Sequence, residues 1–123
     1  MHCGFHTIDA GSFVSPRAMP QMADAHELFS ALEESREKSQ TKLLSIVASE
    51  GGARRAAEFS HIDSWGYPFS VSEIFQERNS RKTIQNAIED LKRVKELALK
   101  SNVELVVYLS MAFGNPYGED YHT

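Results

Sequence analysis

Residues 6–16, with the sequence HTIDAGSFVSP, decide the fold because they join an apolar strand to a polar loop. Apolar residues flank Asp9, which predicts the carboxyl end of a buried strand, and Gly11 and Ser12 follow where the chain is expected to turn. A carboxylate and a hydroxyl at the carboxyl end of a strand are groups that a parallel α/β sheet presents to a ligand. In a (β/α) barrel the same place is the rim of the active site.

The rest of the chain repeats this arrangement, with strand patterns and helix patterns in alternation. Strands are predicted at residues 3–10, 43–48, 62–67 and 103–110, and helical segments at 24–38, 53–59, 70–79 and 84–101. Glu50, Gly51 and Gly52 are expected to turn the chain between the second strand and the helix that follows it. Thr83 is expected to cap the last helix and Asn102 to end it in a left-handed turn. The third strand is the weakest prediction because Pro68 lies close to it. The order β-α-β-α-β-α-β is typical of an α/β fold with parallel strands and right-handed crossovers.

Length, composition and charge narrow the class of protein. The chain has 123 residues, 41% hydrophobic and 24% charged, which suits one globular domain. The net charge of −4 provides no basic surface, so nucleic-acid binding is not expected as the main function. Cys3 is the one cysteine and cannot form an internal disulfide. No apolar run approaches the ~20 residues of a membrane span, and we expect a soluble cytoplasmic protein without membrane contact.

The predicted sheet begins and ends with a strand, so both of its edges are bare. Bare apolar edges invite pairing with another chain, and we therefore expect self-association. A complete (β/α)₈ barrel needs about 250 residues, roughly twice this length. The expectation is a single partial TIM-barrel domain over residues 1–123, incomplete at both ends.

Three sequence blocks resemble 3-hydroxy-3-methylglutaryl-CoA lyases. The blocks are DAGSFVSP followed by MPQM (9–16 and 19–22), SVSEIF with RN (70–75 and 78–79), and YLS leading to GNPYG (108–110 and 114–118). They stand in the family's order and span nearly the whole chain. The resemblance implies a metal-dependent (β/α)₈ barrel that cleaves 3-hydroxy-3-methylglutaryl-CoA to acetyl-CoA and acetoacetate by retro-aldol or Claisen-type chemistry. It also implies that the chain runs from about the second barrel strand to just past the fifth.

The resemblance assigns expected roles to five residues. Asp9 aligns with an acidic residue, usually Glu, that orients the groups of the metal site, and Ser12 with a serine beside the acyl group. Arg78 and Asn79 fall where the family contacts the CoA part of the substrate, and Tyr108 aligns with a tyrosine that lines the acyl pocket. The family's metal ligands come from other strands. A divalent cation (Mg²⁺ or Mn²⁺) is therefore expected in the complete parent but not in this chain, which is expected to be inactive alone.

Other interpretations of the same residues stay open. Asp9 can instead be a structural rim carboxylate bonded to backbone amides, and Ser12 a turn residue. His2, Cys3 and His6 superficially suggest a metal cluster, but strand alternation places Cys3 on the opposite face from the two histidines. The parent can also be a 2-isopropylmalate or homocitrate synthase-like acyltransferase, which shares the fold. A non-catalytic α/β interaction module, acting through its bare strands, is the third alternative.

Overall fold

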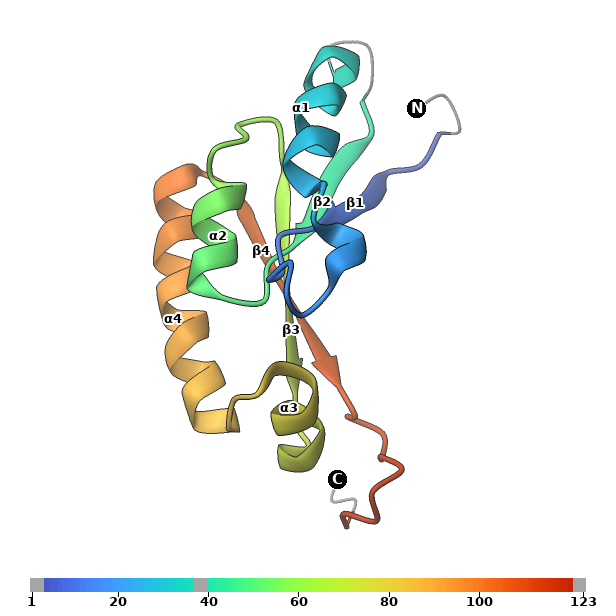
Figure 1. Ribbon diagram of the computed structural model, residues 1–123, viewed down its shortest axis with the longest axis vertical. Coiled ribbons are helices and arrows are strands. Elements are labelled where there is room, and N and C mark those ends of the chain that lie inside the picture. Colours follow the sequence, from blue (N-terminus) through green and yellow to red (C-terminus); the bar gives the residue numbers. More distant parts are fainter. Residues whose placement is uncertain (1–3, 37–39, 121–123) are drawn as a thin grey trace.

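The computed structural model describes residues 4–36 and 40–120 and contains one parallel sheet with helices (Figure 1). The elements are β1 (Thr7–Ser12), η1 (Pro20–Met22), α1 (Ala25–Arg36), β2 (Lys42–Ile46), α2 (Glu50–Ala56), β3 (Ser64–Ser70), α3 (Glu73–Ser80), α4 (Ile84–Ser101) and β4 (Glu104–Ser110). The sheet order is β1-β2-β3-β4, and each neighbouring pair is parallel. The predicted alternation of strands and helices is confirmed.

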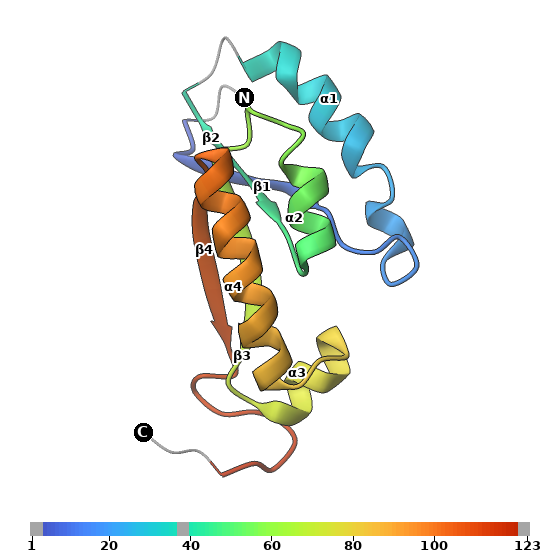
Figure 2. The same cartoon turned by 90° about the vertical axis from the view of Figure 1, so that its left-hand side faces the viewer.

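Helices α1, α2 and α4 cover one face of the sheet, as the two views show (Figures 1 and 2). One continuous core joins them, with Phe29 from α1, Ala53 from α2 and Val94 from α4 packed around Trp65 of β3. Alternate residues of the strands point to the opposite face, which none of the three helices covers. This second face is called the open face below. Helix α3 lies at the carboxyl end of β3 (Figure 1).

Strand β1 extends further than the sequence pattern indicated. The predicted turn at Gly11 and Ser12 is wrong, because both residues pair with β2 and the ladder continues with a bond from the Phe13 N–H to the Ile46 carbonyl (2.9 Å). The predicted start at Cys3 lies outside the described residues. The first strand therefore carries its polar residues within the sheet rather than beyond it.

Helix α2 begins three residues earlier than predicted. Ser49 caps it by accepting a hydrogen bond from the Gly52 N–H (3.1 Å), so Gly51 and Gly52 are helical and do not form a turn. The glycine pair suggested a break, but the cap upstream of it satisfies the first amides of a helix.

Strand β3 contains Pro68, although proline cannot donate to a ladder. The pairing of β3 with β2 ends at Gly66, so Pro68 lies where β3 has β4 as its neighbour on one side and no paired strand on the other. The proline is thus placed as on an edge strand. The predicted strand at 62–67 is correspondingly shifted toward the carboxyl end, to Ser64–Ser70.

The last helix agrees with its sequence signals. The Thr83 hydroxyl accepts a hydrogen bond from the Asn86 N–H (3.1 Å), and Asn102 ends α4 in the left-handed region with φ 54°. The segment predicted as a helical turn at 70–79 is the eight-residue helix α3, capped by Ser72. No helix in the described part of the chain is long and apolar enough to cross a membrane.

Candidate functional site

Asp9 and Ser12 lie on the open face because β1 contains one extra residue. The register passes from Asp9 opposite Leu44 to Gly11 opposite Ser45, so one residue of β1 has no partner between them. In a regular strand, residues three apart point to opposite faces. The unpaired residue forms a β-bulge, which shifts the alternation of side chains between the two faces by one position. Asp9 and Ser12 therefore point to the same face as their partners, Leu44 and Ile46.

The Asp9 carboxyl is favoured in its protonated form relative to a free aspartate. Burial raises its pKa above the ordinary value, and a hydrogen bond from the backbone of Gly11 opposes this shift. Asp9 is at the same time one of the exposed residues of β1, so contact with solvent limits this effect.

Ser12 is buried, and its hydroxyl has no hydrogen-bond partner among the described residues. A shielded hydroxyl without a partner costs free energy, because its bonds to water are lost without replacement. Binding of a ligand oxygen beside Ser12 would recover that cost. The structure thus places Ser12 at the carboxyl end of β1, as the sequence pattern predicted, but in the strand and not in a turn.

Tyr108 lies on the same open face, across Gly66 of the neighbouring strand. A Cβ built on Gly66 would lie 2.6 Å from the Tyr108 ring, 2.8 Å from the Ile46 side chain and 3.2 Å from the Leu44 side chain. These residues form an apolar floor beneath the tyrosine. Tyr108 and Asp9 share a face but are not in contact, because three strand spacings of roughly 4.8 Å separate β1 from β4.

Replacing Gly66 by alanine is expected to displace the Tyr108 ring while leaving the fold intact. The colliding atoms belong to side chains that can move, and Tyr108 is 40% exposed, so the cost in the free energy of unfolding should be about 1 kcal/mol. NMR chemical shifts of the Tyr108 ring and of the Ile46 methyl groups measure the displacement. Unchanged shifts at both side chains would contradict this packing.

Arg78 and Asn79 are exposed on α3, beyond the carboxyl end of β3. The Arg78 guanidinium carbon lies 4.7 Å from the centre of the Tyr117 ring, a cation–π contact with the segment that follows β4. This pair is therefore close to the rim formed by β3 and β4 but apart from Asp9 and Ser12. The five predicted residues occupy two regions, the open face and the surface of α3.

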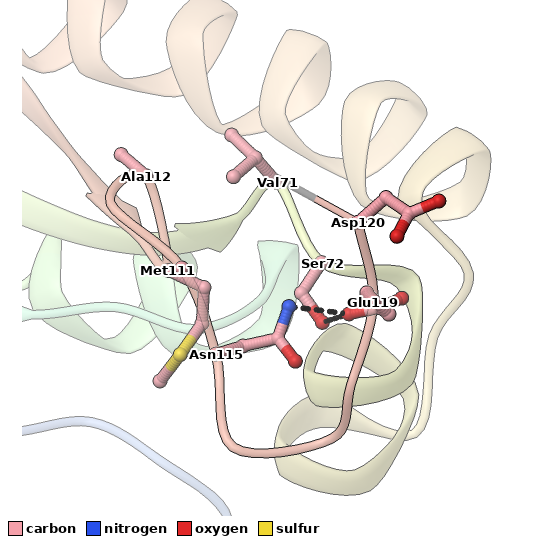
Figure 3. A pocket seen from close by; sticks show the side chains of 8 residues that line it. Val71, Ser72, Met111, Ala112, Asn115, Glu119 and Asp120 are labelled. Atoms are coloured by element: carbon pink, nitrogen blue, oxygen red, sulfur yellow. Dashed lines mark hydrogen bonds between the residues drawn. The ribbon is translucent and has the colours of Figure 1, made fainter. Parts of the chain in front are cut away.

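A pocket that the sequence reasoning missed lies between the carboxyl ends of β3 and β4 (Figure 3). Its lining consists of Val71, Ser72, Met111, Ala112, Gly114, Asn115, Glu119 and Asp120. Glu119 accepts hydrogen bonds from the Ser72 hydroxyl and from the Asn115 side-chain amide (2.9 Å). A serine just before a helix is a recognisable capping residue, so Ser72 could be identified from the sequence. Its contact with Glu119 could not, because the two residues are 47 positions apart in the chain.

The described residues do not provide a metal site. No group of three or more His, Cys, Asp and Glu side chains is placed to hold a metal ion in the described ranges, 4–36 and 40–120. Of the suggested cluster, His2 and Cys3 lie outside those ranges, and the His6 Nδ1 is hydrogen-bonded to the Thr7 hydroxyl (2.8 Å).

Comparisons with known proteins identify what the chain is similar to. No protein-family model matches it. It is 31% identical over 117 residues to the 3-hydroxy-3-isohexenylglutaryl-CoA/hydroxymethylglutaryl-CoA lyase of Pseudomonas aeruginosa, covering 95% of this chain and 38% of the relative. The crystal structure of the Bacillus subtilis HMG-CoA lyase superposes with a TM-score of 0.88 at 27% identity, over 98% of this chain and 39% of that one.

A third similarity concerns the fold alone. The Acinetobacter baumannii HMG-CoA lyase, solved in complex with coenzyme A and 3-methylmalate, has a TM-score of 0.83 at 24% identity and covers 97% of this chain. The predicted resemblance and the partial (β/α)₈ barrel are confirmed by these comparisons. The chain spans less than two fifths of the length of the curated relative, 38%.

Proposed function

We propose that this chain is one part of a carbon–carbon lyase that cleaves 3-hydroxy-3-methylglutaryl-CoA to acetyl-CoA and acetoacetate, and that it does not catalyse the reaction alone. The observation that carries the proposal is the similarity over nearly the whole chain, in sequence and in fold, to proteins named as lyases of this substrate. Within this proposal, residues 1–123 form a single partial-barrel domain. The place of action is proposed to be the cytoplasm.

The open face is proposed to receive the acyl part of the substrate. Cleavage requires removal of the proton from a tertiary hydroxyl, breakage of the adjacent carbon–carbon bond and protonation of the departing enolate. Asp9 would orient the groups that surround the reacting atoms, and Ser12 would hydrogen-bond beside the acyl group. Tyr108, held across Gly66, would line the apolar side of the pocket.

The surface of α3 is proposed to bind the CoA part. A guanidinium recognises phosphate well, and Arg78 is exposed beside the rim, with Asn79 next to it as a hydrogen-bonding partner. The complex of the Acinetobacter baumannii lyase with coenzyme A supports an acyl-CoA partner. A divalent cation, Mg²⁺ or Mn²⁺, is proposed for the complete parent, where it would polarise substrate oxygens.

The acyltransferase alternative is not favoured, because the relatives are named as lyases and not as synthases. Analysis of acyl-CoA products from the full-length parent separates the two. A lyase releases acetoacetate from hydroxymethylglutaryl-CoA, whereas a synthase consumes acetyl-CoA with a 2-oxo acid.

Self-association of the isolated chain is a further part of the proposal. Strands β1 and β4 form the two edges of the sheet, and Leu109 and Phe113 at the β4 side are 61% and 95% exposed. Unpaired edges beside exposed apolar side chains favour pairing between copies. Size-exclusion chromatography with light scattering tests this, and a stable monomer at micromolar concentration would contradict it.

The purified chain is expected to show no turnover of hydroxymethylglutaryl-CoA in the presence of Mg²⁺, because the described residues offer no cation site. Coupled detection of acetoacetate measures the reaction. The full-length parent in the same assay is the control and is expected to be active. Cleavage by the chain alone, at a rate comparable with the parent, would show that these residues suffice for catalysis.

A further inference from the structure

We propose that Glu119 is a positioning residue that holds the segment after β4 against α3 and thereby fixes the location of the Arg78 guanidinium. The inference rests on the proposed function for the identity of the ligand, since Arg78 is the group proposed to contact CoA. Glu119 lies just outside the third of the sequence blocks that resemble the lyases, which ends at Gly118.

The carboxylate of Glu119 joins three parts of the rim. One oxygen accepts bonds from the Ser72 hydroxyl and from the Asn115 amide (2.9 Å), as Figure 3 shows. The other oxygen lies 3.5 Å from the backbone nitrogen of Ile74. Ser72 at the same time accepts the Phe75 N–H (3.1 Å) as the cap of α3. A carboxylate at this place also interacts favourably with the positive end of the α3 dipole.

A second contact between the same two segments lies one turn further along α3. The Tyr117 ring centre is 4.7 Å from the Arg78 guanidinium carbon and 6.5 Å from the Phe75 ring centre. The two contacts are linked through Asn115, whose amide nitrogen donates to Glu119 while its side-chain oxygen accepts the Tyr117 N–H (2.9 Å). Loss of the Glu119 carboxylate therefore releases Asn115, and with it the backbone that carries Tyr117.

Arg78 depends on this arrangement because its side chain is long and exposed. An exposed arginine samples many rotamers, and a stacked ring selects a few of them. The Tyr117 ring is such a partner, and Glu119 holds the segment that presents it. Removing Glu119 should loosen Arg78 without touching the core under α4.

The test compares Glu119→Gln with Asp120→Asn in the 123-residue chain. Asp120 is the adjacent acidic residue and lines the same pocket, so it controls for the loss of one charge. The expected result for Glu119→Gln is amide hydrogen exchange at Ile74 and Phe75 at least tenfold faster, together with loss of the ring-current shift at the Arg78 side chain. Asp120→Asn is expected to change neither. An unchanged Arg78 shift in Glu119→Gln would overturn the proposal.

Three further measurements distinguish the positioning role from a general effect on stability and from the question of which ligand binds. Exchange at Val47 and Trp65, in the core, should not change in Glu119→Gln, and uniform acceleration there would show a purely structural role. Asn115→Ala should reproduce the Arg78 effect. Titration of coenzyme A into the wild-type chain is read separately: absence of binding would count against the proposed ligand but not against the positioning role.

Discussion

Replacing Asp90 by alanine is expected to destabilise the folded chain by about 3 kcal/mol, because a half-buried ammonium and a buried phenol lose the carboxylate that accepts their hydrogen bonds. The Asp90 carboxylate accepts bonds from the Lys82 ammonium (2.7 Å), the Tyr67 hydroxyl (3.0 Å) and the Glu50 N–H (3.2 Å). Lys82 also donates to the Ala48 carbonyl (3.0 Å). The hydrogen bonds of Asp90 and Lys82 therefore link α4 to β3 and to the turn between β2 and α2. Urea unfolding followed by circular dichroism measures the loss.

The matched control is Glu89→Ala, at the preceding position of the same helix. The Glu89 side chain is 46% exposed and pairs with Lys92 (2.8 Å), an i, i+3 surface pair that solvent screens, so its loss should destabilise the chain far less than the loss of Asp90. Equal effects at the two positions would contradict a special role for the buried group.

The pH dependence of stability provides an independent check on Asp90. Burial raises the pKa of its carboxyl, but bonds from Lys82, Glu50 and Tyr67 outweigh this and leave the pKa below its ordinary value. A folded-state pKa below the unfolded one means stabilisation that is complete above the unfolded value, ~3.9, and is lost as the pH falls through the folded value. The difference in unfolding free energy between wild type and Asp90→Ala should therefore be constant near pH 6 and shrink below about pH 4.

Replacing Gly52 by alanine is expected to destabilise the chain by roughly 1–3 kcal/mol, although alanine is the better helix former. A Cβ at this position would lie 2.5 Å from the backbone carbonyl oxygen of Phe13. That oxygen also accepts a bond from Arg55 (2.8 Å), so α2 cannot move away from it without losing this contact. Because the colliding atom belongs to the backbone, no side-chain rotation relieves the overlap.

The adjacent Gly51 is the control for this second substitution. A Cβ on Gly51 would meet nothing closer than the Ser49 hydroxyl at 3.9 Å, so Gly51→Ala should be neutral or should stabilise the chain by up to about 1 kcal/mol. Urea unfolding of the two variants is thus expected to show changes of opposite sign in the free energy of unfolding, although the two glycines are neighbours in one helix. Destabilisation of similar size at both positions would point to a backbone requirement shared by the pair.

Local patterns were enough to predict the order of the elements and the parallel fold. Helix α4 shows why, since its apolar stripe, its Thr83 cap and its Asn102 end all lie within the segment itself. The same patterns failed at the ends of β1 and α2. At both places, glycines suggested a turn, but pairing with β2 and the Ser49 cap decided otherwise.

What the sequence alone determined about this protein is the succession of strands and helices, together with motifs that resemble those of hydroxymethylglutaryl-CoA lyases. Tertiary structure alone decided that Asp9 and Ser12 share a face of the sheet. The pairing register with β2 sets the face to which each side chain points, and the single unpaired residue between them moves Ser12 to the face of Asp9. Tertiary structure also decided that Glu119 meets Ser72, since that contact joins segments distant along the chain. Periodicity and capping act over a few residues, whereas register and long-range hydrogen bonds depend on how the whole sheet is packed.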